Sequence, residues 1–281
     1  MKRFALIVVV MVLLAPQSFA GTWNKSYADA MKKAKSSNQL VFVDLFADWC
    51  GWCHRMEQEV FPSEIFQKAT DKMVLLRLNT EDGGDGTKFA QKFNVNSLPT
   101  FLILTPDDSV AGVLRGYAPA KEFVTEMEST QARYRDFQKR AATEETFAAD
   151  YKKRFDLALE FTQHFAFPQA ESRFRKLTSE PKTPADIRDR AYYELAVAQA
   201  LQNRFVDATS TLNAFSKVQT KGESYERGRL LQAQMYWQQG NLMAAANELR
   251  QFKTRFPSSP LKDNADQMLQ VVQQQLLSQK K

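Results

Sequence analysis

Two cysteines, Cys50 and Cys53, are the residues of this sequence whose type and spacing could carry out chemistry. They are the only cysteines among 281 residues, so the chain can form one intramolecular disulfide at most. With two residues between them, both sulfurs can face each other across one helical turn and close a disulfide with little strain. The pair follows an almost continuously apolar run at residues 40–47, which predicts a buried strand, and helical spacing begins at Gly51.

A position between a strand and a helix favours a reactive thiol. Free backbone N–H groups and the positive end of the helix dipole stabilise a thiolate there. Cys50, the more N-terminal sulfur, is expected to be exposed, more acidic and the nucleophile, and Cys53 is expected to resolve the mixed disulfide. This chemistry needs no dissociable cofactor. The two histidines, His54 and His164, leave too few ligands for an all-protein zinc site.

The elements around the cysteines alternate between strands and helices, which predicts an α/β layer architecture in the order β-α-β-α-β-β-α after a first helix. Pro106 and the two aspartates after it mark the turn between the last two strands. The expected strands are residues 40–47, 73–78, 100–104 and 110–115, and the expected helices are residues 27–36, 51–62, 87–93 and 119–130.

Residues 43–53 (VDLFADWCGWC) resemble the active-site segment of the thioredoxin family. Residues 97–101 (SLPTF) resemble the cis-proline loop of that family, and Gly116 resembles the glycine before its last helix. The resemblance covers residues 21–130 and implies a central mixed sheet flanked by helices. It also implies a thiol–disulfide oxidoreductase that acts on client proteins with cysteines or disulfides and works with a redox partner protein. Trp52 stands where thioredoxin has proline, so the redox potential cannot be transferred.

Two charged residues are candidates for supporting roles. Asp44 is the one charged residue of its strand, and a buried carboxylate without a partner is costly. The resemblance implies that Asp44 handles the proton of Cys53, and that Arg77 stands where a family lysine faces this aspartate. The alternative is a purely structural ion pair between Asp44 and Arg77.

The resemblance also implies contacts with a client. It makes the bond before Pro99 cis, and Leu98 could then pair its backbone with an extended substrate strand; an ordinary trans turn proline is the alternative. Of the two tryptophans beside the sulfurs, Trp52 is expected to contact clients and Trp49 to be packed.

Residues 50–54 also satisfy the C-x-x-C-H pattern of covalent haem attachment. The preceding strand and the later SLPTF segment favour a thiol site instead. His54 is then a neighbour of Cys53 or a helix-surface residue.

The first twenty residues are typical of a secretory signal. Lys2 and Arg3 precede an apolar run at residues 4–15, and Ser18 and Ala20 are small residues at the positions that signal peptidase recognises. Cleavage after Ala20 predicts secretion across the inner membrane, into a bacterial periplasm; an uncleaved anchor is the alternative. No later stretch is long and apolar enough to span a membrane.

Composition changes near residue 130. Residues 21–130 carry 12 Lys and Arg against 15 Asp and Glu, whereas residues 131–281 carry 24 against 17. The cations of the second half are spread along helical patterns, so a solvated helical surface is expected and nucleic acid is not an expected partner.

The second half repeats. Helix starts at Phe167, Phe205 and Leu242 are each followed by apolar residues seven and ten positions later. The pattern is similar to tetratricopeptide repeats, with a terminal capping helix at residues 261–275. Such repeats imply a protein partner, and a spacer or dimerisation module is the alternative.

The sequence thus predicts a signal peptide at residues 1–20, a thioredoxin-like domain at 21–130, a helical connector at 131–153 and tetratricopeptide-like repeats at 154–281. The expected protein is a secreted oxidoreductase whose repeats recruit a partner. The alternative is a binding scaffold or chaperone-like adaptor with a secondary redox role.

Overall fold

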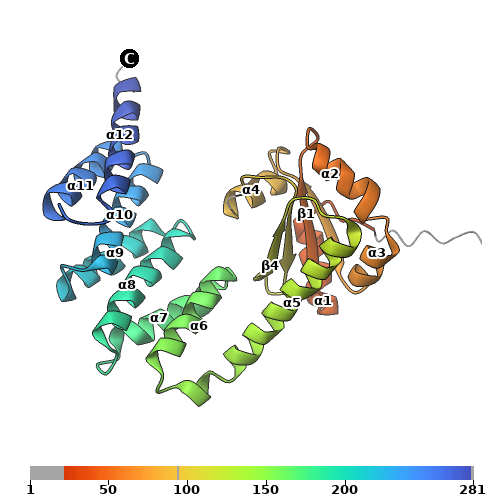
Figure 1. The fold of residues 1–281 in the computed structure, drawn as a ribbon, viewed down its shortest axis with the longest axis horizontal. Coiled ribbons are helices and arrows are strands. Elements are labelled where there is room, and N and C mark those ends of the chain that lie inside the picture. Colours follow the sequence, from red (N-terminus) through yellow and green to blue (C-terminus); the bar gives the residue numbers. More distant parts are fainter. Residues whose placement is uncertain (1–21, 94, 280–281) are drawn as a thin grey trace, which may run out of the picture. The chain divides into compact units, whose positions relative to one another are not determined.

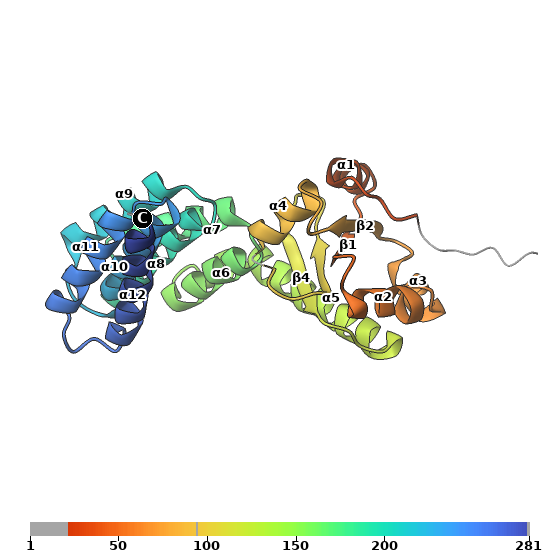
Figure 2. The same cartoon turned by 90° about the horizontal axis from the view of Figure 1, so that it is seen from above.

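The computed structural model describes residues 22–93 and 95–279, so the signal expected at residues 1–20 lies outside the described residues. The chain forms two compact units. Residues 113–130 belong with the chain before Ser109, and residues 109–112 belong with the chain from Gln131 onward. Figures 1 and 2 show the elements of both units.

A four-stranded mixed sheet forms the centre of the first unit, with strand order β2-β1-β3-β4. β1 pairs in parallel with β2 and antiparallel with β3. This arrangement confirms the predicted thioredoxin-like α/β fold. The strands are β1 (Val41–Phe46), β2 (Val74–Asn79), β3 (Thr100–Leu104) and β4 (Val110–Arg115).

Helices cover both faces of this sheet. α1 and α4 lie on one face, and α2, α3 and α5 lie on the other (Figure 2). On the second face Phe42 of β1 stacks on Phe101 of β3 at 5.6 Å and meets Phe66 of α3 at 5.4 Å, which joins the sheet to the helices through buried rings. The helical elements are α1 (Tyr27–Ser37), α2 (Gly51–Arg55), the π-helical η1 (Met56–Val60), α3 (Glu64–Thr70), α4 (Asp85–Lys92) and α5 (Ala120–Ala142).

Three details differ from the sequence-based expectation. The helix expected at residues 51–62 changes to a π-helix at Met56. α3 is an additional helix, whose N-cap Ser63 accepts the N–H of Phe66. The closing helix continues to Ala142 because no glycine or proline interrupts residues 120–142.

The second unit is helical, as expected. Consecutive helices from α6 to α12 pack against each other, and α8 also contacts α6 and α10. The helices are α6 (Tyr151–Gln163), α7 (Phe167–Ser179), α8 (Ala185–Ala200), α9 (Phe205–Val218), α10 (Glu223–Gln238), α11 (Leu242–Arg255) and α12 (Lys262–Ser278), and a 3₁₀ turn, η2 (Glu144–Phe147), precedes them.

The positions picked out by the repeat spacing lie in the core of this unit. Turns between paired helices contain Asn203 and Gly240 in the left-handed region, with φ of 58° and 74°. The residues seven and ten positions after each helix start are all buried: Phe174, Leu177, Leu212, Phe215, Leu249 and Phe252.

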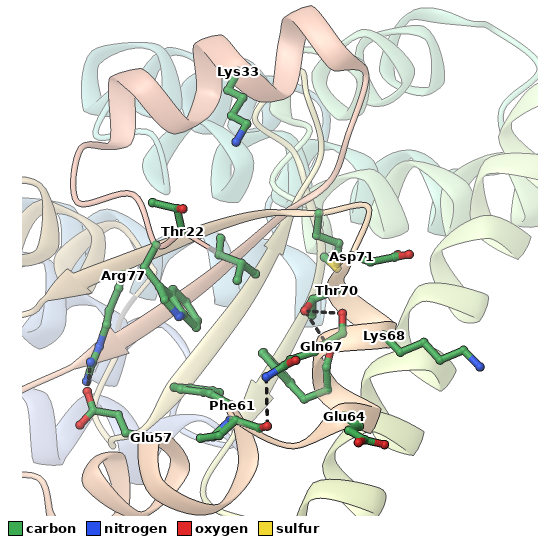
Figure 3. Close-up of a pocket in the computed structure, with 15 residues that line it drawn as sticks. Thr22, Lys33, Glu57, Phe61, Glu64, Gln67, Lys68, Thr70, Asp71 and Arg77 are labelled. Atoms are coloured by element: carbon green, nitrogen blue, oxygen red, sulfur yellow. Dashed lines mark hydrogen bonds and ion pairs between the residues drawn. The ribbon is translucent and has the colours of Figure 1, made fainter. Parts of the chain in front are cut away.

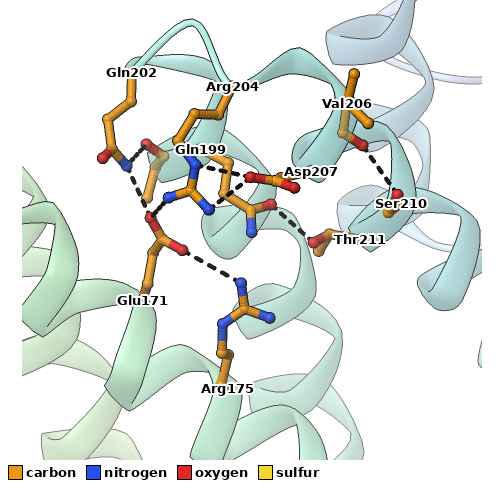
Figure 4. Close-up of polar contacts among 10 residues, drawn as sticks. Glu171, Arg175, Gln199, Gln202, Arg204, Val206, Asp207, Ser210 and Thr211 are labelled. Atoms are coloured by element: carbon orange, nitrogen blue, oxygen red, sulfur yellow. Dashed lines mark hydrogen bonds and ion pairs between the residues drawn. The ribbon is translucent and has the colours of Figure 1, made fainter.

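A polar cluster connects neighbouring helices of the second unit (Figure 4). The buried carboxylate of Glu171 on α7 accepts hydrogen bonds from Arg204 at 2.6 Å and Gln202 at 2.8 Å, both from the turn between α8 and α9. Because the charge of Glu171 is paired, its burial is compatible with a stable helix interface.

Within residues 22–93 and 95–279, no helix combines the length and apolar character needed to cross a lipid bilayer.

Replacing Phe215 by alanine should destabilise the helical unit by about 3–5 kcal/mol, because a fully buried aromatic ring leaves a cavity when it is truncated. Its ring stacks on Tyr192 at 5.2 Å. Urea denaturation of the full chain, followed by circular dichroism at 222 nm, measures the change. Val206→Ala is the control, since Val206 is 80% exposed and its truncation should change stability by less than about 0.5 kcal/mol. Equal effects of the two substitutions would contradict this core.

Candidate active site

The two cysteines form a disulfide at the junction between β1 and α2. Cys50 is the N-cap residue of α2, and its Cα lies 5.2 Å from that of Cys53. The backbone N–H of Cys53 donates to Sγ of Cys50 at 3.1 Å. An N–H directed at this sulfur is the kind of donor that stabilises a thiolate at the start of a helix.

The expected exposure of Cys50 is wrong for this oxidised form. Cys50 is 3% exposed and Cys53 is 1% exposed. Sγ of Cys50 is bonded to Sγ of Cys53, and it also accepts the N–H of Cys53 in the first turn of α2. The two sulfurs therefore differ in their place on the helix more than in their exposure.

Asp44 and Arg77 lie side by side on paired strands. The parallel register of β1 and β2 places Asp44 opposite Arg77, and Nε of Arg77 lies 3.0 Å from Oδ2 of Asp44. The contact is an ion pair rather than an aligned hydrogen bond, and Oδ1 of Asp44 accepts no hydrogen bond from the described residues. Burial raises the pKa of the Asp44 carboxyl to about 7, although Arg77 opposes that rise.

Glu57 is a charged neighbour that sequence reasoning missed. Its carboxylate forms a second ion pair with Arg77, through Nη1 (Figure 3). One guanidinium therefore forms ion pairs with two carboxylates. The spacing could have indicated that Glu57 lies near the site, because it follows Cys53 by four residues and so lies one turn further along the same helical segment.

His54 lies on the exposed side of the same turn. Its Nε2 donates to the carbonyl oxygen of Asp48 at 2.8 Å, and its Nδ1 lies 3.4 Å from Oε2 of Glu57. Both sulfurs of the C-x-x-C-H segment are joined to each other in this form. Among the described residues, no group of three or more His, Cys, Asp or Glu side chains could hold a metal ion.

The loop that contains Pro99 leads into β3 at the end of the sheet where β1 ends, and the segment with the cysteines follows β1 there. The Leu98–Pro99 bond is cis, as the resemblance implied. Thr100, the next residue, pairs with Leu45 in β1, so the start of β3 and the end of β1 are neighbours. Pro99 is buried, Leu98 is half-buried, and the carbonyl of Pro99 accepts the N–H of Gly116 at 2.9 Å.

Both tryptophans beside the disulfide are exposed, so the expected packing of Trp49 is wrong. Trp49 is 70% exposed, and its indole N–H donates to Glu81 at 2.8 Å. That hydrogen bond is to a loop residue after β2, so it holds the ring at the surface. Trp52 is 54% exposed.

Known proteins resemble the first unit. Residues 27–131 match the family model of a thioredoxin-like domain. The thiol:disulfide interchange protein DsbD of Pseudomonas fluorescens is 36% identical over 81 residues, which are 28% of this chain and 14% of that protein. Thioredoxin-T of Drosophila melanogaster is 33% identical over 69 residues, which are 25% of this chain and 41% of that protein.

Among solved structures, the oxidised C-terminal domain of DsbD from Neisseria meningitidis is 17% identical, with a TM-score of 0.35, and the match covers 39% of this chain and 99% of that domain. The chain spans less than half the length of the two relatives named above. Residues 27–131 form a thioredoxin-like domain.

Replacing Asp44 by asparagine should stabilise the oxidised protein increasingly as pH rises. The pKa of Asp44 is about 7 in the folded protein, against an ordinary value of 3.8. Between these values the unfolded chain releases a proton that the folded protein keeps, so stability falls as pH increases. The loss reaches roughly 4 kcal/mol above pH 7, and the asparagine variant does not suffer it.

Guanidinium unfolding of both proteins at pH 4, 6 and 8 tests this pH dependence. The stability difference between Asp44→Asn and the parent should be near zero at pH 4 and largest at pH 8. Asp48→Asn, at an exposed carboxylate nearby, is the matched control and should show no such growth. A constant difference for Asp44→Asn across this pH range would contradict the raised pKa.

Proposed function

We propose that this thioredoxin-like domain is a thiol–disulfide oxidoreductase that reduces, forms or exchanges disulfides in client proteins. The observation that carries the proposal is the Cys50–Cys53 disulfide at a strand-to-helix junction, with a backbone N–H directed at Sγ of Cys50. This arrangement can alternate between a dithiol and a disulfide without rebuilding the fold, since both cysteines lie within one turn.

In the reductive direction, the Cys50 thiolate attacks one sulfur of a client disulfide. A bond forms between Sγ of Cys50 and that sulfur, and the other client sulfur leaves as a thiolate and takes up a proton. Cys53 then loses its proton and attacks Sγ of Cys50, which releases the second client thiol. Two electrons pass from the protein dithiol to the client, and the oxidative direction reverses each step.

Asp44 is proposed as the group that accepts the proton of Cys53. A carboxyl with a pKa of about 7 can accept and release a proton near neutral pH. Arg77 pairs with its ionised form, and Glu57 competes for Arg77. Pro99 and Leu98 are proposed to present the backbone against which an extended client segment lies.

The helical unit is proposed to recruit a protein partner through tetratricopeptide-like repeats. Stacked helix pairs with buried repeat positions support that proposal. The excess of cations over residues 131–281 favours a partner with an acidic surface. The signal-like segment at residues 1–20 supports secretion, with the periplasm of a bacterium as the proposed location.

The protein lacking residues 1–20 should reduce insulin in the presence of dithiothreitol, or reoxidise a reduced client. Cys50→Ala should abolish both activities, because the sulfur that forms the mixed disulfide with the client is missing. The same variant distinguishes the oxidoreductase from the alternative, a binding scaffold. A scaffold would keep its partner binding and its cellular function without the dithiol. An inactive parent protein whose disulfide still cycles would refute the general oxidoreductase proposal.

Cys53→Ala should trap clients as mixed disulfides on Cys50, since the resolving thiol is missing. Non-reducing gels followed by mass spectrometry of the adducts identify the sulfur that carries the client. The reduced parent protein should also be alkylated first at Cys50. Faster alkylation at Cys53 would reverse the assignment of the two roles.

A further inference from the structure

Trp52 lies between the two cysteines and is held in one orientation by residues from a distant loop. Its ring stacks on that of Tyr117, with centroids 5.3 Å apart and planes inclined by 28°. Tyr117 follows Gly116 in the connection between β4 and α5, 65 positions after Trp52 in the sequence. One face of the indole is therefore covered, while half of the side chain stays exposed.

Arg55 and Glu59 complete the support. The Arg55 guanidinium lies 5.5 Å from the centroid of Trp52 and 4.8 Å from that of Tyr117. Nε of Arg55 donates to Glu59 at 2.8 Å, and the hydroxyl of Tyr117 donates to the other oxygen of the same carboxylate. These four side chains form a closed set of contacts, which we call the Trp52 platform.

The platform is apolar and electrically balanced where a client would meet it. The positive charge of Arg55 is paired with Glu59, so neither charge is left to attract or repel a client strongly. An aromatic ring that is already oriented loses little further freedom on binding, which is the property of binding hot spots. Trp52 lies between the two cysteines in the sequence, so a client joined to Cys50 in a mixed disulfide would have the residues beside its own cysteine near this ring.

We propose that the Trp52 platform selects clients that carry an aromatic side chain next to the reacting cysteine. The inference rests on the proposed oxidoreductase function and names its preferred substrate class. Tyr117 acts as a positioning residue, because it orients Trp52 rather than reacting with the client. The occupant of the platform is an aromatic ring of an extended client segment, stacked on or against the exposed part of the indole.

Two short peptide disulfides that differ only in one residue beside the cysteine, phenylalanine or glycine, test this selectivity. The dithiol form of the full protein reduces each peptide disulfide to two thiols and becomes the Cys50–Cys53 disulfide. The ratio of kcat/KM for the phenylalanine peptide to that for the glycine peptide should be roughly three to ten, the range expected for one aromatic pair. The difference should lie in KM rather than kcat.

Variants show whether the platform is responsible. Tyr117→Phe keeps the stacked ring and should retain the preference, whereas Tyr117→Ala should reduce it to within about twofold. Trp52→Ala, at an exposed side chain, should abolish the preference even if Tyr117→Ala does not fold. Tyr151→Ala is the matched control, since Tyr151 is also half-buried and lies beside an arginine, Arg154, but in the helical unit; it should leave the ratio unchanged.

The outcomes separate the two proposals. If the parent protein neither reduces the peptide disulfides nor, in its disulfide form, oxidises the reduced peptides, the proposed function fails. If it reduces both peptides equally well, or if Trp52→Ala keeps the full preference, the oxidoreductase stands and the Trp52 platform is overturned as a selectivity element.

Discussion

The position of Cys50 is the constraint on which the redox unit depends. This residue ends the connection from a buried strand and caps the following helix, so its sulfur meets the backbone N–H of Cys53, which also donates to the carbonyl oxygen of Cys50. β1 is buried and pairs with β2 on one side and β3 on the other, so the point at which the chain leaves the sheet is fixed. The sheet and the rings around Phe42 thereby determine where the disulfide lies, although none of those residues takes part in its chemistry.

The electrostatics around Asp44 depend on Arg77, a single cation that forms ion pairs with two carboxylates. Arg77 must compensate Asp44, which is buried, and Glu57, which is partly exposed. Burial raises the pKa of the Asp44 carboxyl to about 7, and the nearby Arg77 guanidinium opposes that rise. The π-helical turn at Met56–Val60 carries Glu57 to this position, and such turns often occur at functional sites. Structural and functional readings of the Asp44–Arg77 pair are therefore compatible.

The helical unit follows a different principle. Its helices are stabilised by stacking, because each pair buries phenylalanine and leucine residues at repeated positions against the next. Charged groups inside the stack are paired, as Glu171 is with Arg204 (Figure 4). A surface built this way can vary at its exposed positions without loss of the core. The redox unit, by contrast, has its exposed aromatic rings beside the disulfide.

The sequence alone determined the features that depend on local pattern. The apolar run before Cys50, the C-x-x-C spacing and the SLPTF segment predicted the α/β fold and allowed one disulfide, and the family resemblance that they carry placed Asp44 opposite Arg77. Repeat spacing picked out six of the buried residues of the helical unit. These features can be predicted from the sequence because backbone periodicity and burial act on residues that are close in the chain.

Tertiary structure decided what depends on residues far apart in the chain. Trp49 donates a hydrogen bond to Glu81, Trp52 stacks on Tyr117, and Asp44 forms its ion pair with Arg77. For the two tryptophans the partner comes from a distant loop, and no local pattern specifies that the fold brings these side chains together. A carboxylate or an aromatic ring acquires its pKa, exposure and orientation from those neighbours, and they are known only once the chain has folded.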